Sequence, residues 1–410
     1  MPTPTDSSIG AEPLDCQRIA FSIPEGICYL NSAYMGPLPI AVQSAGHDAV
    51  DVRAQPWTIS PNDFFAPAER VRALCAGLIN APAEQLALIP NTSWGTAVIA
   101  ANLEPRPGTN VVILAEQFPS NVHPWRRWRA QGVEIRSVHA PQGPLAGRAA
   151  RWSEAVISAI DGHTILVSVE QAHWTDGTLF DLEAIGQSAR RVGAAYVVDA
   201  TQTAGAMPID FSAIGADALI VHSYKAMLCN YGLGFMALSP RFMNGKPLDD
   251  NWLLREGSDN FATLTDYADR YAPGARRFDT SLRANPSLIA MLEASCKLLR
   301  TWGPARIRSY LLGIVRPQLA RLEAAGFVTA PEAERAANIF GIGLPPGLEP
   351  EALRRLLAER AIFVSVRSGA LRVAPHVYND EADIARLADA LLEALSLTPR
   401  RRAMPDRLGI

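Results

Sequence analysis

A lysine follows an apolar, strand-like run in the middle of the 410-residue chain. The run is DALIVHS (217–223), and the lysine is Lys225. Desolvating an ammonium group is costly, so a lysine directed into a protein interior is normally paired, neutral or chemically modified. A second strand-like run, AAYVVDA (194–200), ends with Asp199. An ion pair is the simplest interpretation of a lysine and a carboxylate at neighbouring strand ends, and a shared chemical site is the alternative.

Two further features favour the chemical site. Thr92 and Ser93 begin a helix-like segment, where free backbone N–H groups, hydroxyls and the helix dipole suit a phosphate dianion. Phe118, at the end of another strand-like run, supplies a flat apolar face. Taken separately, these features are more often an N-cap and a core aromatic residue. Their combination with a carboxylate and a lysine points to one ligand with several chemical groups.

A phosphorylated aromatic heterocycle bearing an aldehyde would use all four groups. Pyridoxal 5'-phosphate is the cofactor with this profile. Lys225 would form a Schiff base with the aldehyde, which explains how it can be buried without carrying an ammonium into the interior. Asp199 would keep the pyridine nitrogen protonated, so that the ring accepts electrons from the substrate α-carbon.

The elements that position these residues alternate between helix and strand. We expect helices over 93–103, 151–160 and 181–193, and strands over 110–118, 163–171, 194–200 and 217–223. The strands are continuous apolar runs, which is typical of a mostly parallel sheet buried on both faces. In such α/β folds the ligand lies at the carboxyl ends of the strands, where Asp199 and Lys225 occur.

The pattern changes after about residue 250, where helices alternate with a few short strand-like pieces. We therefore expect a disordered N-terminal arm over 1–20, a large cofactor-binding domain over 21–275, and a small α+β C-terminal domain over 276–410.

The composition indicates which binding partners and which cellular compartment to expect. With 38 basic and 41 acidic side chains, the net charge of -3 predicts no attraction to nucleic acid or to an anionic membrane. Five scattered cysteines without a CxxC pair predict neither disulfides nor a metal site. The first 15 residues lack a leader pattern, and no apolar run has transmembrane length. These features predict a cytoplasmic protein.

The motifs YLNSAYMGPLP (29–39), NTSWGTA (91–97), VVDATQTAG (197–205), HSYKAMLCNYGLGF (222–235) and LRVAPHVYN (371–379) resemble one family. This is the class V aminotransferase group of fold-type I pyridoxal-phosphate enzymes, which includes cysteine desulfurases, kynureninases and isopenicillin N epimerase-like proteins. The resemblance implies a seven-stranded, mostly parallel sheet between helices, followed by the small domain. It also implies a homodimer with the active site near the subunit interface.

The resemblance assigns roles residue by residue. Lys225 and Asp199 are implied to be catalytic. Residues implied to bind the cofactor are Thr92, Ser93, Phe118, Asp199, Gln202, His222, Tyr224 and Lys225. Gln202 corresponds to the partner of the phenolic oxygen, and Phe118 to the ring that stacks on the cofactor. Arg372 is implied to bind the substrate α-carboxylate, and Asn31 and Trp174 are expected near the substrate.

The reaction stays open among three outcomes after the Schiff base passes to an amino acid and Lys225 removes the α-proton. Transamination is the first expectation. β- or γ-elimination, as in a C–S lyase or kynureninase, and epimerisation or racemisation are the alternatives. Persulfide-forming desulfuration is disfavoured because FVSVRSGALRVAPH (363–376) contains no cysteine, and Cys229 is expected to be a packed thiol.

Proteins of other classes are also alternatives. A non-catalytic binding protein on this scaffold is disfavoured because Lys225, Asp199, Gln202 and Arg372 are all present. A nicotinamide dehydrogenase is disfavoured because no GxGxxG opens a helix after the first strand.

Overall fold

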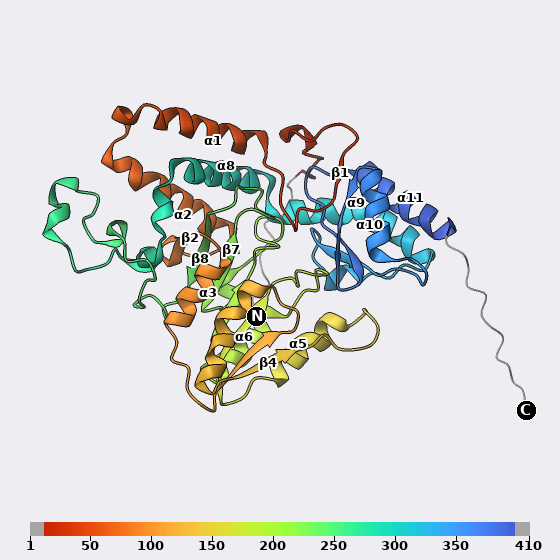
Figure 1. The fold of residues 1–410 in the computed structure, drawn as a ribbon, viewed down its shortest axis with the longest axis horizontal. Coiled ribbons are helices and arrows are strands. Elements are labelled where there is room, and N and C mark those ends of the chain that lie inside the picture. Colours follow the sequence, from red (N-terminus) through yellow and green to blue (C-terminus); the bar gives the residue numbers. More distant parts are fainter. Residues whose placement is uncertain (1–11, 398–410) are drawn as a thin grey trace, which may run out of the picture.

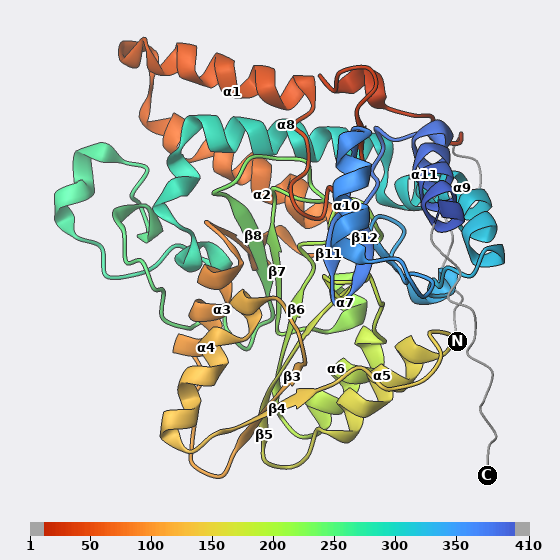
Figure 2. The same cartoon turned by 45° about the vertical axis from the view of Figure 1, so that its right-hand side comes forward.

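A computed structural model describes residues 12–397 (Figures 1 and 2). Residues 1–11 of the expected N-terminal arm therefore lie outside the described residues. The following residues are held against the C-terminal part of the chain, because Arg18 forms an ion pair with Asp383 at 3.1 Å.

Seven strands form the central sheet in the order β2-β8-β7-β6-β5-β3-β4. Their bounds are β2 Leu86–Ile89, β3 Asn110–Leu114, β4 Glu134–Val138, β5 Thr164–Glu170, β6 Ala195–Asp199, β7 Ala218–His222 and β8 Gly234–Leu238. β8 is antiparallel to both of its neighbours, whereas the pairs from β7 to β4 are parallel. The mostly parallel seven-stranded sheet expected from the sequence is confirmed.

Successive residues of each strand enter two different hydrophobic cores, since side chains alternate across a sheet. On one face, Val111 and Ile113 of β3 share a core with residues of α3 (Thr92–Ala101) and α4 (His123–Arg126). On the other face, Val112 and Leu114 share a core with α2 (Ala66–Leu78), α5 (Arg148–Ser158), α6 (Leu182–Arg191) and α7 (Phe211–Ile214). Burial on both faces accounts for the continuous apolar strands in the sequence.

A helical layer lies along one side of this sheet (Figure 1). There α8 (Pro286–Trp302) packs against α1 (Ile40–Arg53) and α2. Gly303 then turns the chain with a φ of 76° into α9 (Pro304–Ala324), which packs against α11 (Glu381–Leu397). The proposed domain boundary near residue 275 stays a prediction.

The C-terminal part of the chain adds two small sheets. One is antiparallel with the order β11-β12-β9, formed by β9 Phe340–Ile342, β11 Ser365–Arg367 and β12 Ala370–Val373. The other pairs β1 (Cys28–Tyr29) in parallel with β10 (Ile362–Phe363), beside α10 (Pro350–Glu359). Residues near position 30 are thereby attached to residues near position 365, far away in the sequence.

The expected helices over 93–103, 151–160 and 181–193 occur as α3, α5 and α6. The four expected strands occur as β3, β5, β6 and β7. Within residues 12–397, no helix combines the length and apolar character needed to cross a bilayer.

A buried ion pair fixes the edge strand β2 to α2. The Oδ2 atom of Asp279 lies 2.7 Å from Nη2 of Arg72, and both side chains are fully buried. Oδ1 of Asp279 also accepts the backbone N–H of Leu88 in β2, at 2.8 Å. Removing the carboxylate would leave the Arg72 guanidinium buried with weaker compensation.

We expect Asp279→Ala to lower the free energy of unfolding by about 3–5 kcal/mol, because the buried Arg72 guanidinium then keeps only the partly exposed carboxylate of Glu69 as an ion-pair partner. The measurement is urea denaturation at fixed pH. The control is Glu104→Ala, which removes the exposed partner of Arg106 and should change stability by at most about 0.5 kcal/mol. Equal effects of the two substitutions would contradict a structural role for Asp279.

Candidate active site

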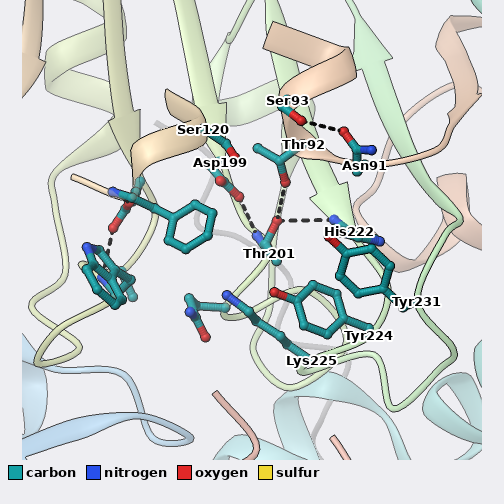
Figure 3. Close-up of a pocket in the computed structure, with 15 residues that line it drawn as sticks. Asn91, Thr92, Ser93, Ser120, Asp199, Thr201, His222, Tyr224, Lys225 and Tyr231 are labelled. Atoms are coloured by element: carbon teal, nitrogen blue, oxygen red, sulfur yellow. Dashed lines mark hydrogen bonds between the residues drawn. The ribbon is translucent and has the colours of Figure 1, made fainter. Parts of the chain in front are cut away.

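A cavity opens at the carboxyl ends of β3, β5, β6 and β7 (Figure 3). This is the edge at which a parallel α/β sheet is expected to bind its ligand. The residues that line the cavity are Asn91, Thr92, Ser93, Phe118, Ser120, Glu170, Ala172, Trp174, Asp199, Thr201, Gln202, His222, Tyr224, Lys225 and Tyr231.

The N-terminus of α3 forms one end of the cavity. The side chain of Asn91 caps the helix by accepting the Trp94 N–H at 2.9 Å, and it also accepts the Ser93 hydroxyl at 2.7 Å. The hydroxyl oxygens of Thr92 and Thr201, which both line the cavity, lie 3.2 Å apart. The hydroxyls, the first-turn N–H groups and the helix dipole together suit an anion such as a phosphate.

Asp199 is held from two sides at the end of β6. Its Oδ1 accepts the Thr201 N–H at 2.8 Å, and its Oδ2 accepts the Asn121 side-chain amide at 2.7 Å. The Thr201 hydroxyl also accepts the backbone N–H of His222 at 3.1 Å. The carboxylate is therefore held by residues that follow two different strands, β3 and β6, and one of them is bonded in turn to the end of β7.

Lys225 is only 5% exposed, and its Nζ lies 4.8 Å from the centroid of the Phe118 ring. Burial lowers the pKa of Lys225 to about 8, with Asp199 opposing this shift and Arg372 adding to it. The amine is therefore more easily deprotonated than an exposed lysine, as a nucleophile or proton carrier requires.

The turn that carries Lys225 is covered by the N-terminal part of the chain. Gly36 donates its N–H to the carbonyl of Tyr224 at 2.9 Å. A Cβ at Gly36 would lie 2.4 Å from the carbonyl oxygen of Lys225. Glycine is required for this close approach.

Three rings cluster beside the lysine. His222, Tyr224 and Tyr231 have ring centroids 4.5–4.7 Å apart. Burial and then Lys225 lower the pKa of His222 to about 4, so its imidazole is neutral at pH 7. Burial raises the pKa of Tyr224 to about 12. Both side chains therefore keep their protonation state across the neutral range and act as neutral hydrogen-bonding groups.

Phe118 and Trp174 form an aromatic wall, with ring centroids 5.6 Å apart in an edge-to-face arrangement. Their backbone N–H groups donate to the two carboxyl oxygens of Glu170, at 2.9 and 2.8 Å. Glu170 ends β5 and is buried. Its desolvation and the nearby Asp199 raise its pKa to about 8. This second carboxyl group therefore positions both rings.

Arg372 and Asn31 lie outside the lining of the cavity. Arg372 is 1% exposed and lies behind Trp174, whose carbonyl accepts its Nη1 at 3.0 Å. Its Nη2 lies 3.4 Å from the Ser365 hydroxyl, which in turn donates to Oδ1 of Asn31 at 2.8 Å. Asn31 therefore contacts the Ser365 hydroxyl, which in turn orients Arg372.

The structure thus brings into one cavity most of the residues predicted from sequence: Thr92, Ser93, Phe118, Trp174, Asp199, Gln202, His222, Tyr224 and Lys225. The sequence interpretation missed Glu170, Asn121 and Thr201. Glu170 lies at the end of a predicted strand, Asn121 lies three residues after another, and Thr201 lies within the motif 197–205, so position alone could have identified them as candidates. Within residues 12–397, no group of three or more His, Cys, Asp or Glu side chains is placed to hold a metal.

A family model described as aminotransferase class-V matches residues 61–387. A probable cysteine desulfurase of Methanothermobacter thermautotrophicus is 36% identical over 42% of this chain and 42% of its own length. The isopenicillin N epimerase of Streptomyces clavuligerus is 27% identical, over 88% of this chain and 93% of its own.

Among solved structures, a mutant of C-DES with glycine covalently linked to its PLP cofactor has a TM-score of 0.81. It is 18% identical in sequence, and the match covers 93% of this chain and 100% of that one. A likeness at this level of identity establishes the fold.

Glu170 should make stability depend on pH. A carboxyl group whose pKa is raised on folding binds its proton more tightly in the folded protein, so ionisation destabilises the fold. We expect the wild-type protein to lose free energy of unfolding relative to Glu170→Gln as the pH rises from about 5, with the loss levelling off above about 8.

Denaturation with urea at several pH values measures this difference. Glu183→Gln, which removes an exposed carboxyl group from α6, is the matched control. A constant difference between the wild-type protein and Glu170→Gln across this range would contradict the prediction.

Proposed function

The chain belongs to the class V aminotransferase family of pyridoxal-phosphate enzymes, and we propose that it transfers the amino group of an α-amino acid to a 2-oxo acid. The observation that carries this proposal is Lys225, a buried amine with a lowered pKa beside Asp199 in the same cavity.

The residues of the cavity fit the cofactor of the family. Oε1 of Gln202 is buried and has no hydrogen-bond partner in the described residues, so it is free to accept a hydrogen bond from a ligand. We propose that Thr92, Ser93, His222 and Tyr224 hold the phosphate, that Asp199 faces the pyridine nitrogen, and that Phe118 covers the ring. Lys225 would attach to the aldehyde. When bound, the cofactor accepts electrons from the substrate α-carbon.

Lys225 is also proposed to carry the proton from the substrate α-carbon. A neutral amine is required for this task, and the lowered pKa of Lys225 provides one near neutral pH. His222 has a pKa of about 4 and Tyr224 a pKa of about 12, so neither exchanges protons readily at pH 7. One mobile proton carrier suits transamination better than epimerisation, which must return the proton to the opposite face.

β-Elimination is the second candidate, because the same lysine can remove the α-proton before a side-chain group leaves. Its support is the fold shared with C-DES, which is named a cystine C–S lyase. Persulfide formation has less support. The turn Arg367–Ala370 between β11 and β12 has no cysteine, and burial raises the pKa of Cys229 to about 12.

A homodimer and a cytoplasmic location stay predictions. Support for a dimer comes from apolar side chains on the surface, which often mark an interface. Trp252, Phe261 and Tyr267 are exposed on the extended segment 245–273, drawn in green at the left of Figure 1. Tyr34 and Met35, near the lysine turn, are also exposed.

The rate of cofactor capture should report the pKa of Lys225. When pyridoxal phosphate is added to cofactor-free protein, we expect the rate constant to rise with pH and to level off above about 8, because the neutral amine attacks the aldehyde. Lys225→Ala should lose the borohydride-stable attachment, whereas Lys246→Ala should keep it. Attachment to Lys225→Ala would overturn the assignment of the lysine.

Product analysis with a panel of amino acids separates the reactions. Transamination predicts a 2-oxo acid from the donor and an equal amount of a new amino acid from an added 2-oxo acid acceptor. Ammonia in place of the new amino acid would establish elimination. Solvent deuterium at the α-carbon of both enantiomers, with no other product, would establish epimerisation and overturn the proposal.

A further inference from the structure

Two arginines lie against the same indole ring at the active site. The Cζ atom of Arg372, in β12, lies 5.9 Å from the centroid of the Trp174 ring, and Cζ of Arg367, at the end of β11, lies 5.4 Å from it. Each distance is within the range of a cation–π contact. Two positive charges therefore meet at the aromatic wall of the cavity.

Neither arginine forms an ion pair with a carboxylate among the described residues. Arg372 donates to two neutral acceptors, the Trp174 carbonyl and the Ser365 hydroxyl. Arg367 donates to the carbonyl of its neighbour Val366. The Nε atoms of Arg367 and Arg372 are buried, and neither has a hydrogen-bond partner within residues 12–397. Because a guanidinium keeps its charge, burying Arg372 without an anion is unfavourable, and the partly exposed Arg367 adds a second unpaired positive charge beside it.

The carboxylate of Glu116 faces the hairpin formed by β11 and β12, but it bonds the turn of this hairpin and not Arg367. Oε2 of Glu116 accepts the hydroxyl of Ser368, the residue that follows Arg367, at 2.8 Å. The backbone carbonyl of Glu116 accepts the indole N–H of Trp174 at 2.7 Å. The loop after β3 therefore fixes the indole and the hairpin turn, and Arg367 has no ion-pair partner there.

The two guanidiniums also differ in depth. Arg372 is almost completely buried, whereas Arg367 is partly exposed and adjoins the exposed residues Ser368 and Gly369. A ligand that reaches both would place one anionic group in the interior and the other toward the hairpin turn.

We infer that Arg367 is a second anion-binding residue of the active site and that the substrate is an α-amino acid with a carboxylate in its side chain. This inference rests on the proposed function, in which Arg372 binds the α-carboxylate. The Arg367 guanidinium binds the side-chain carboxylate, and the ligand neutralises both arginines. Binding involves no covalent step.

Calorimetric titration of the cofactor-loaded protein with glutarate and with pentanoate tests the inference without turnover. The two acids have the same number of carbons and differ by one carboxylate. We expect the wild-type protein to bind glutarate about tenfold more tightly than pentanoate, as one additional charge-assisted contact provides. Arg367→Gln should bind both acids about equally, and Arg367→Lys should retain part of the preference.

Arg355→Gln is the matched control, because it removes the same charge from the exposed face of α10 and should keep the full preference for glutarate. Circular dichroism checks that each variant is folded. If Arg367→Gln does not fold, the result with Arg367→Lys decides the test. Equal affinities in the wild-type protein, no binding of either acid, or a full preference in the Arg367 variants would overturn the inference.

The same preparations separate this inference from the proposed function. Borohydride reduction of the wild-type protein reports whether Lys225 carries the cofactor. A protein that prefers glutarate but carries no reducible cofactor would overturn the proposed function and retain the anion-binding pair. A protein with the reducible cofactor and no preference for glutarate would overturn only the assignment of the substrate class.

Discussion

The Asp199 carboxylate and its hydrogen bonds hold the active site together. Asn121 reaches it from the segment after β3, and Thr201 from the segment after β6. The Thr201 hydroxyl then contacts the start of α3 through Thr92 and the end of β7 through the His222 N–H. One buried acidic group therefore aligns the start of α3 with the strand that leads to the lysine.

The position of each residue along its strand explains how much the sequence could predict. Parallel strands place their carboxyl ends at one edge, so Asp199 and Lys225 could be assigned to one site before any coordinates were known. The resemblance to the family supplied Gln202 and Arg372. The contacts of Glu170 could not be predicted in this way. Its role depends on the backbone N–H groups of Phe118 and Trp174, whose approach is determined by tertiary packing.

Charge within the site is arranged in two zones. Asp199 and Glu170 lie on the side of the sheet, where burial and then the proximity of Asp199 raise the pKa of Glu170. Arg367 and Arg372 lie on the side of the C-terminal hairpin, and both lower the pKa of Lys225. The lysine between these zones is subject to opposing electrostatic effects, and burial decides the outcome. The same side chains that are suited to bind ligands therefore also adjust the basicity of the Lys225 amine.

The contact between Asn31 and Ser365 joins residues 334 positions apart in the chain. During synthesis from the N-terminus, the segment near Asn31 leaves the ribosome long before β10 and β11 exist. All seven strands of the sheet lie within residues 86–238, whereas the surroundings of Arg372 also need β9, β11 and β12, which follow much later in the chain. A nascent chain could therefore bring the strands around Asp199 together before the arginines of β11 and β12 have been synthesised.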